Sequence, residues 1–472
     1  MASTSWVRRV ARVLFRRFPG AKHFVVHRIL APWHHWRYGA RAVGRGHVSA
    51  SNPDVELRLL KLEGALHLAR VRCAETATKP TADVQRRMVL MDMRITQISM
   101  RERGIPRYAT ALALALPEHL TGADMAYLVD PDQPMPDALD ALQTRGRIVQ
   151  GAAEIGGLGH VSHYLQSCIF ELHKDADELF PPELGRFRPH ISAIVYDVIP
   201  WLFPQQYLSD PYLARRYAYQ LSLLPSLNHL FAISNCARDD VARVANLPLE
   251  SITNIYGGID ESRWGAPQPD TANGSPLEIS NAQGERFVLR QPYWLYVGGG
   301  DFRKNVQGLV RAFANVLAAL PHIPERPALV IACNLHAEQR KEMAALAASL
   351  HLEPGADVII TGFVSDAVLA TCYRNAFATV FPSLYEGLGL PVLESYHFGV
   401  PALASNVSSL TEVTPASCQF DPASEESIAQ AMLRMHKTPQ LRAESLAFGR
   451  EIMAVCNWQQ AASKLAEHLL RW

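Results

Sequence analysis

The sequence predicts an α/β protein with two doubly wound parallel sheets that face each other across a cleft, preceded by a helical extension. Short apolar runs typical of buried strands alternate with helical patterns over both halves of the chain, and this alternation favours parallel sheets. The 472 residues suffice for two or three domains of ~100–200 residues. With 48% hydrophobic and 19% charged residues, the composition is typical of a globular protein with a packed core.

Charge, cysteine content and hydropathy argue against nucleic-acid binding, a disulfide framework and a membrane span. The 46 Lys and Arg residues nearly balance 45 Asp and Glu residues, so the net charge of +1 gives no overall signature of nucleic-acid binding. The seven cysteines contain no C-x-x-C pair, which favours free thiols in a reducing cytoplasm. No uncharged apolar run reaches the ~18–20 residues of a membrane span. No secretory signal is evident either. We therefore expect a cytoplasmic protein.

Residues 1–83 predict a basic, largely helical extension. Met1 to His47 contain ten Lys or Arg residues and no acidic residue. Residues 6–18 (WVRRVARVLFRRF) place apolar residues on one helical side and arginines mostly elsewhere, and such a helix can lie on an anionic bilayer surface. A solvated basic tail, or a helix packed on its own protein, fits the same pattern. Residues 55–71 predict a second helix.

The first α/β domain is predicted at residues 84–262. RRMVLMDMR reads as a buried strand, and RERGIPRYATALALAL as a glycine turn that opens into a helix. Further strands are expected at ADMAYLVD and at Ile191–Tyr196, with a helix between His163 and Glu178. A strand should end at Ser234, where a helix begins. A Pro-, Gly-, Asn- and Ser-rich stretch then predicts a linker at residues 263–288.

One acidic pair in this domain has the form of a metal motif. Asp130 and Asp132 make a D-x-D, which can hold a divalent cation against a diphosphate. They flank Pro131 in a proline-rich turn, where Asp side chains favour local hydrogen bonds. The turn is the better interpretation, so we predict no metal site.

The second domain is predicted at residues 289–452, with a C-terminal helix at 453–472 that crosses back to the first domain. Trp294–Val297 should be a strand, followed by a flexible loop of three glycines and a helix at Asn305–Leu317. This loop lacks the third glycine of G-x-G-x-x-G, which argues against a dehydrogenase.

The stretch from Phe381 to Val413, together with the apolar run before it, predicts a strand, a tight loop and a helix. Ala376–Phe381 is the apolar strand, and Pro391 suits the first turn of the helix. Free N–H groups at the start of such a helix favour an anion such as a diphosphate. We expect Glu386 at the carboxyl end of the strand and Glu394 in the first helical turn, both reaching into one crevice, where open α/β sheets bind ligands.

The run EGLGLPVLE, with FPS-x-YEG before it and GVPALASN after it, resembles the E-x7-E signature of retaining nucleotide-sugar glycosyltransferases of the GT-B fold, particularly glycosyltransferase family 4. The resemblance covers about residues 86–470. It implies two Rossmann-like domains and transfer of a hexosyl group from a nucleoside-diphosphate sugar, GDP-mannose type favoured, to a sugar or lipid-linked glycan. It also implies a role in surface polysaccharide or lipopolysaccharide synthesis, with no metal cofactor.

The resemblance also assigns site residues. It gives catalytic roles to Asp197, Arg303, Lys304 and Glu386. The donor-binding residues, apart from the two cations and Glu386, are Gly104, Gly299, Gly300, Phe363, Val364, Gly387, Gly389, Leu390 and Glu394. The acceptor-side residues are Arg103, Arg107, Tyr108, Tyr196 and Ser234. The assignment of the cations agrees with physical chemistry, because fixed positive charges stabilise the charge that accumulates on a departing diphosphate.

Two positions depart from the family pattern. Pro106 stands where a second glycine is usual. Tyr196 stands where a histidine is usual, and a phenol that titrates near ~10 cannot serve as a base at neutral pH. Asp197 fits either a functional role or the capping of its loop, and Glu412 fits either a functional or a helix-start role. A non-catalytic scaffold and a phosphorylase- or synthase-like relative remain as alternatives.

Overall fold

The structure is a computed structural model that describes residues 53–73, 87–98, 104–135, 137–264, 276–321 and 326–471. The predicted amphipathic helix at residues 6–18 and Arg103 lie outside these ranges. The helix expected at residues 55–71 is α4 (Pro53–Cys73), which buries Leu68 and Val71. None of the helices in the described ranges is long and apolar enough to span a membrane.

The first domain contains a seven-stranded, all-parallel sheet in the order β3-β2-β1-β4-β5-β6-β7. Because β1 pairs with both β2 and β4, the direction in which the sheet grows reverses there, as in doubly wound folds. The strands are β1 (Arg87–Asp92), β2 (Ala123–Val129), β3 (Arg147–Gln150), β4 (Val161–Gln166), β5 (His190–Val195), β6 (His229–Ala232) and β7 (Ile252–Asn254). The helix predicted from residue 163 is wrong, since His163 lies within β4.

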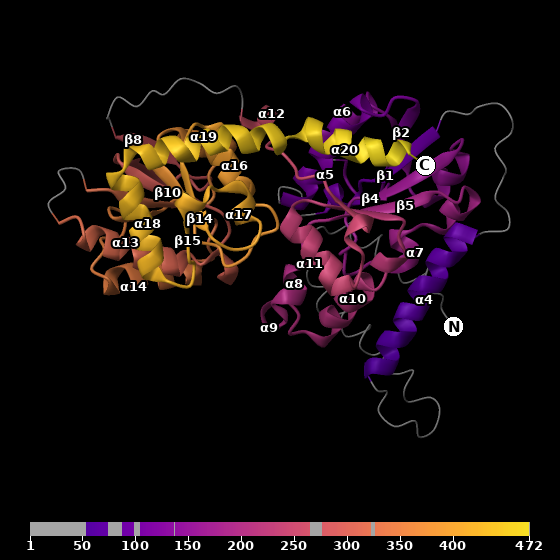
Figure 1. Ribbon diagram of the computed structural model, residues 1–472, viewed down its shortest axis with the longest axis horizontal. Coiled ribbons are helices and arrows are strands. Elements are labelled where there is room, and N and C mark those ends of the chain that lie inside the picture. Colours follow the sequence, from indigo (N-terminus) through magenta and orange to yellow (C-terminus); the bar gives the residue numbers. More distant parts are fainter. Residues whose placement is uncertain are drawn as a thin grey trace. The chain divides into compact units, whose positions relative to one another are not determined.

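Helices connect these strands and cover the faces of the sheet (Figure 1). The α-helices are α5 (Gly104–Ala115), α6 (Asp137–Gln143), α7 (Ala176–Leu179), α8 (Ile199–Leu202), α9 (Pro204–Tyr207), α10 (Pro211–Leu221) and α11 (Asn235–Ala245). The 3₁₀ turns are η2 (Arg94–Gln97), η3 (Leu116–Glu118), η4 (Ala152–Gly157), η5 (Pro182–Arg186), η6 (Leu224–Ser226) and η7 (Leu249–Ser251).

The second domain has a six-stranded parallel sheet in the order β12-β11-β10-β13-β14-β15 and an antiparallel hairpin, β8–β9. Here β10 pairs with both β11 and β13, so a second reversal lies between β10 and β13. The strands are β8 (Leu277–Ser280), β9 (Arg286–Leu289), β10 (Tyr293–Val297), β11 (Ala328–Ala332), β12 (Val358–Ile360), β13 (Ala378–Phe381), β14 (Ala402–Ser405) and β15 (Gln419–Phe420). The hairpin falls, up to residue 288, in the range predicted as a linker.

Two apolar clusters line the second sheet, one of them around the buried Trp294 and Phe313. The α-helices are α12 (Glu261–Trp264), α13 (Val306–Ala318), α14 (Ala337–Ser349), α15 (Asp366–Arg374), α16 (Leu390–His397), α17 (Leu410–Val413), α18 (Glu425–Lys437) and α19 (Pro439–Val455). The 3₁₀ turns are η8 (Phe302–Lys304) and η9 (Ala416–Cys418). The helix predicted at Asn305–Leu317 is confirmed as α13.

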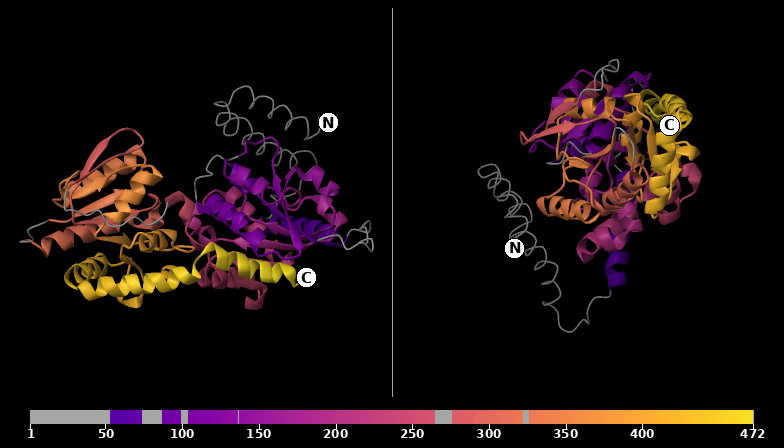
Figure 2. Two further views of the ribbon diagram at one scale, coloured as in Figure 1. Left: turned by 90° about the horizontal axis from the view of Figure 1, so that it is seen from above. Right: turned by 90° about the vertical axis from the view of Figure 1, so that its left-hand side faces the viewer.

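The last helix, α20 (Trp458–Leu470), packs on α5 of the first domain, and both lie side by side in Figures 1 and 2. Its inward residues, including Leu465 and Leu469, are almost fully buried. The Trp458 indole N–H donates to the Ile259 carbonyl at 2.9 Å. The chain therefore completes its first domain with its last helix.

Four histidines meet at the amino-terminal edge of the first sheet. The rings of His163 and His190 stack with centroids 5.4 Å apart, and those of His229 and His468 stack at 3.6 Å. Burial, together with His190, lowers the pKa of His163 to about 3, and burial with His468 lowers that of His229 to about 4. Between these values and pH 6.5 the His163 and His229 rings stay neutral in the folded chain while the unfolded chain takes up protons, so stability falls as the pH falls through this range.

We predict that His229→Gln reduces this acid sensitivity. Because the folded-state pKa of His229 is about 4, this residue lowers the free energy of unfolding by about 2 kcal/mol when the pH falls from 7 to 5. Urea unfolding midpoints at the two pH values measure the difference. His351→Asn, at an exposed histidine, is the matched control. An equal decrease of the urea midpoint from pH 7 to pH 5 in the wild type and in His229→Gln would contradict the prediction.

Candidate functional site

The carboxyl ends of β10 and β13 carry the charged residues of the candidate site. A 3₁₀ turn follows β10 and holds Arg303 and Lys304, whereas the loop after β13 holds Glu386. Because β10 and β13 are parallel neighbours at the reversal of strand order, the two loops meet at the edge where open α/β sheets bind ligands.

The loop after β13 has the predicted strand–loop–helix form. Gly389 has a φ of +90°, which a residue without a side chain adopts at little cost, and α16 begins at Leu390 with Pro391 in its first turn. Glu386 lies at the carboxyl end of β13, in the loop and five residues beyond the strand. One detail of the prediction is wrong, because Glu394 is the fifth helical residue and lies in the second turn rather than the first.

Glu386 forms ion pairs with both cations. Its Oε2 accepts from the Arg303 guanidinium at 2.8 Å, and its Oε1 accepts from the Lys304 ammonium at 2.5 Å. The Ser383 hydroxyl donates to Oε1 at 2.7 Å. All three charged side chains are between 13% and 19% exposed. Burial alone would raise the pKa of Glu386, but Lys304 and Arg303 lower it to about 2. The carboxylate is therefore ionised at any physiological pH.

The chain fixes the two cations through local turns. The Asp301 side chain accepts from the Arg303 backbone N–H at 3.1 Å, and Asn305 adopts a left-handed conformation that ends the turn and starts α13. Arg303 also donates to the Tyr385 carbonyl at 2.7 Å, which joins the β10 and β13 loops directly. The Leu384 N–H donates to the Arg303 carbonyl at 2.6 Å. The turn that carries Arg303 and Lys304 is thus held by the backbone of the loop after β13, which it faces.

Asp197 lies against this group from the first domain. A Cβ added at Gly387 would lie 3.3 Å from Asp197 Oδ2 and 2.9 Å from the Tyr196 carbonyl oxygen, so only glycine fits there. Asp197 Oδ1 also accepts from the Ile199 N–H at 2.9 Å, the capping role that the sequence left open. Burial raises the pKa of Asp197, whereas that hydrogen bond and Arg303 act against the increase.

Glu394 is the centre of a second group of charged residues, formed within the second domain. Tyr373 donates to its Oε2 at 2.8 Å, and the Arg263 guanidinium lies 3.5 Å from its Oε1. Arg263 also pairs with Asp366 and stacks 3.9 Å over the Trp264 ring. Burial raises the pKa of Glu394, and Arg263 and Tyr373 counteract the increase. A small cavity lies beside Glu386 and Lys304 and is also lined by Ser383 and Leu410.

The remaining donor-side residues vary in their surroundings. A Cβ at Gly104 or Gly299 would meet nothing closer than 4.0 Å, whereas one at Gly300 would lie 2.3 Å from Leu335. The Phe363 side chain is 46% exposed and Val364 is 6% exposed. The Phe363 carbonyl already accepts from the Ala282 N–H of the β8–β9 hairpin at 2.9 Å.

Three of the acceptor-side residues are enclosed rather than open to a ligand. Tyr108, Tyr196 and Ser234 are 2%, 6% and 0% exposed. The Tyr108 ring packs edge-on against both Tyr196 and Trp458. The Tyr196 hydroxyl has no hydrogen-bond partner among the residues described, and burial raises its pKa well above 10. Arg107 is partly exposed and acts electrostatically on Glu394 and Asp366.

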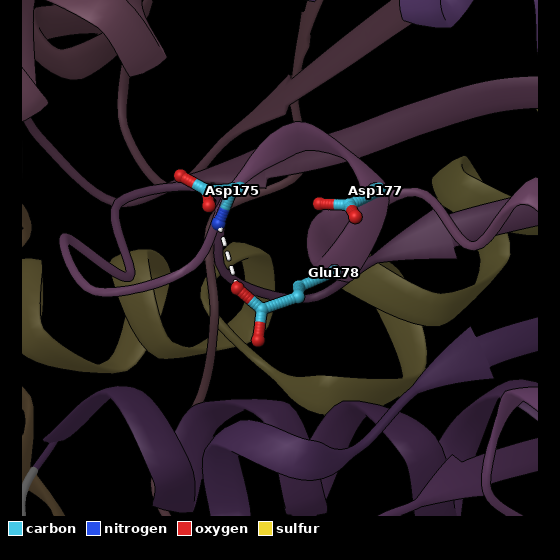
Figure 3. A group of neighbouring side chains, drawn as sticks. All are labelled: Asp175, Asp177 and Glu178. Atoms are coloured by element: carbon cyan, nitrogen blue, oxygen red, sulfur yellow. Dashed lines mark hydrogen bonds between the residues drawn. The ribbon is translucent and has the colours of Figure 1, made fainter. Parts of the chain in front are cut away.

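The acidic groups show how local capping accounts for apparent metal motifs. The Asp132 N–H donates to Asp130 Oδ1 at 2.9 Å, which confirms the turn predicted there. Within the ranges that the structure describes, one group of three potential ligands lies close together, namely Asp175, Asp177 and Glu178 (Figure 3). Asp175 and Glu178 form the capping box of α7, and Asp175 pairs with Arg216 at 2.6 Å. These contacts account for the positions of Asp175 and Glu178 in the cluster.

Sequence reasoning missed the residues that hold the Glu386 loop. The Glu386 N–H donates to the Ser408 hydroxyl, and Glu412, left undecided, contacts the start of α11. The basic residue Arg263, which faces Glu394, was also missed. Its position between the GGID turn and the buried Trp264 was the available signal.

The chain is similar to proteins named as sugar-transferring enzymes. Residues 280–451 match the family model described as Glycosyl transferases group 1. The chain is 26% identical over 375 residues to the Escherichia coli serotype-specific mannosyltransferase WbdA, covering 73% of this chain and 43% of WbdA. It is 27% identical over 245 residues to the E. coli O-antigen chain mannosyltransferase B, covering 51% and 60%. The chain thus spans less than two thirds of the length of these relatives.

A solved structure with the same architecture is that of Anabaena HepE in complex with UDP and glucose, with a TM-score of 0.56. It is 15% identical and covers 82% of this chain and all of HepE. This likeness concerns the fold, which is GT-B: two Rossmann-like domains with parallel sheets. The family match and the mannosyltransferase relatives support a glycosyltransferase.

We predict that Gly389→Ala destabilises the protein more than Gly399→Ala. Both glycines have positive φ angles, of +90° and +70°. A Cβ at Gly389 would also lie 2.8 Å from Leu410, whereas one at Gly399 would meet nothing within 4 Å. We expect a cost of about 1 kcal/mol at Gly399 from backbone strain, and about 2–3 kcal/mol at Gly389. Chemical denaturation measures both, and equal costs would show that Leu410 moves aside freely.

Proposed function

We propose that the protein is a retaining glycosyltransferase of family 4 that transfers a hexosyl group from a nucleoside-diphosphate sugar to a glycan or lipid-linked glycan. The observation that supports this most strongly is the convergence of Arg303, Lys304 and Glu386 at the β10–β13 reversal, with Asp197 beside them. Arg303 and Lys304 bring two fixed positive charges to this edge of the sheet, which suits a diphosphate.

In this proposal Arg303 and Lys304 bind the donor diphosphate. The Glu386 carboxylate neutralises part of their charge before the donor arrives, and the diphosphate then shares the two cations. As the sugar–diphosphate bond breaks, negative charge grows on the leaving group, and the preorganised cations stabilise it without further rearrangement.

Glu386 would then accept hydrogen bonds from hydroxyls of the donor sugar. Its pKa of about 2 keeps it an acceptor at neutral pH. Glu394 would accept from the ribose hydroxyls, with Tyr373 and Arg263 fixing its position. No residue in this group is assigned as a covalent nucleophile, consistent with departure and attack on the same face of the sugar.

Mannose is the favoured sugar and GDP the favoured nucleotide. The support is that WbdA and the O-antigen chain mannosyltransferase B, to which the chain is similar, are mannosyltransferases. By the same similarity we place the reaction in surface polysaccharide or lipopolysaccharide synthesis. Since Arg303 and Lys304 supply the positive charge, we propose that transfer needs no divalent metal.

A panel of nucleotides tests the donor assignment. We predict that one of UDP, GDP, dTDP and ADP, with GDP expected, raises the melting temperature, and that EDTA does not remove the effect. A ligand at ~100 times its Kd adds about 2.7 kcal/mol of stability. Arg303→Ala and Lys304→Ala should each abolish most of the shift. Arg311→Ala and Lys341→Ala, at exposed ion pairs of the same domain, should leave it intact.

The other outcomes identify the alternatives. A folded wild type that responds to no nucleotide would favour a non-catalytic scaffold. Turnover of a sugar 1-phosphate in place of a nucleotide sugar would favour a phosphorylase-like enzyme.

We further propose that the basic segment 1–47 holds the enzyme on the cytoplasmic face of an anionic membrane, where a lipid-linked acceptor would lie. The support is its ten basic residues and absence of acidic ones. We predict that the full chain sediments with vesicles containing ~30% phosphatidylglycerol and not with pure phosphatidylcholine vesicles, and that 0.5 M salt releases it by screening. Replacement of the five arginines at 8, 9, 12, 16 and 17 by glutamine should abolish sedimentation, and unchanged sedimentation would contradict the proposal.

A further inference from the structure

The N-terminus of α11 is occupied by a carboxylate from the second domain. Glu412 Oε2 accepts from the Asn235 N–H at 2.9 Å, and Oε1 accepts from the Cys236 N–H at 2.8 Å. The Tyr256 hydroxyl adds a third hydrogen bond, at 2.8 Å. The first N–H groups of a helix lack partners within the helix and carry partial positive charge, so an ionised side chain binds them strongly. Glu412 therefore fastens α17 to α11.

The segment that carries Glu412 also holds the backbone of Glu386. The Glu386 N–H donates to the Ser408 hydroxyl at 2.9 Å. The Ser409 hydroxyl donates to the Glu386 carbonyl at 2.9 Å. Both polar groups of the Glu386 backbone thus depend on residues 408 and 409, which lie one turn before Glu412. The segment 408–412 thus connects the start of α11 to Glu386, with hydrogen bonds at both of its ends.

A second set of contacts joins α11 to the same loop directly. The Ser234 hydroxyl donates to the Gly387 carbonyl at 2.6 Å while it accepts from the Ala237 N–H at 3.0 Å as the N-cap of α11. The Tyr385 hydroxyl donates to Asp240 of α11 at 2.5 Å. The three consecutive residues 385–387 are therefore each held by α11 or by the segment that Glu412 fastens to it.

Backbone conformation sets this network apart from ordinary packing. Ser408 and Tyr256 have φ angles of +50° and +57°, which residues with side chains rarely adopt. Each makes a hydrogen bond in the network, Ser408 to Glu386 and Tyr256 to Glu412. Unfavourable backbone conformations that persist are held in place by their surroundings and cluster at functional sites.

We propose that α11 orients Glu386 through Glu412 and Ser234, so that the carboxylate faces Arg303 and Lys304 only while α11 is docked on α17. Glu412 and Ser234 are positioning residues, and neither touches the donor. This inference rests on the proposed function for its catalytic consequence, and it deepens that function because it ties donor chemistry to a helix of the acceptor-side domain. A donor bound without this contact would still have its diphosphate held by Arg303 and Lys304. Its sugar would no longer be oriented by Glu386.

Hydrogen exchange tests the contact without reference to activity. In Glu412→Gln, which loses the charge and keeps the shape, we expect the amides of residues 385–387 and 235–236 to exchange about tenfold faster or more. Exchange in β10 should stay unchanged. Glu444→Gln is the matched control, because Glu444 is a carboxylate of the same domain that accepts from Ser417 at an exposed site. Ser424→Ala, which removes the N-cap of α18, is the control for Ser234→Ala.

Kinetics test the consequence for catalysis. With the nucleotide sugar whose nucleotide stabilises the wild type, we expect Glu412→Gln to lower kcat for donor hydrolysis at least tenfold. The Kd for the nucleoside diphosphate alone should stay near the wild-type value, because Arg303 and Lys304 lie within the second domain. A merely structural role would lower nucleotide affinity together with kcat.

The outcomes separate this proposal from the proposed function. Unchanged exchange at 385–387 in both Glu412→Gln and Ser234→Ala would overturn the positioning role, whatever the wild type binds. Faster exchange with kcat unchanged would overturn its catalytic consequence and leave the glycosyltransferase assignment standing. A wild type that binds no nucleotide would overturn the proposed function, while the exchange result would still decide whether α11 holds the loop.

Discussion

The ion pairs of Glu386 with Arg303 and Lys304 are the interaction on which the rest of the site depends. Removing three charges from most of their water is costly, and only mutual pairing and hydrogen bonds offset that cost. The pairing brings together loops from two neighbouring strands, 82 and 83 residues apart in sequence. The sheet order makes it possible, because the reversal between β10 and β13 leaves their carboxyl ends adjacent and uncovered by a crossover helix.

Local chemistry explains why the sequence predicted this part well. Pro391 fixes a helical φ, the glycines at 387 and 389 permit the tight loop, and the apolar run before them marks a buried strand, so α16 begins where these residues allow it. The prediction of a helix from residue 163 was wrong because the local sequence there does not mark a strand. β4 lies in the middle of a parallel sheet yet carries Ser162, His163 and Gln166, so neither a continuous apolar run nor a strict alternation marks it as a strand.

Contacts between distant residues were beyond the reach of sequence patterns. Tyr108 and Ser234 sit in motifs that suggested an open acceptor surface, but their burial depends on Trp458 and Gly387, which lie hundreds of residues away or in the other domain. Likewise, an isolated glutamate at the start of a short helix gives no hint that its partner is another helix. Glu412 acquires its role only when the fold brings α11 within 3 Å of it.

The crossing of α20 back to the first domain has a consequence for how the protein is made. The face of α5 that α20 covers stays exposed until Leu465 and Leu469 have been synthesised, after the whole second domain. Domains usually fold one after another as they leave the ribosome. Here the first domain waits for the second, so a chain interrupted before Leu465 leaves the covered face of α5 open to solvent.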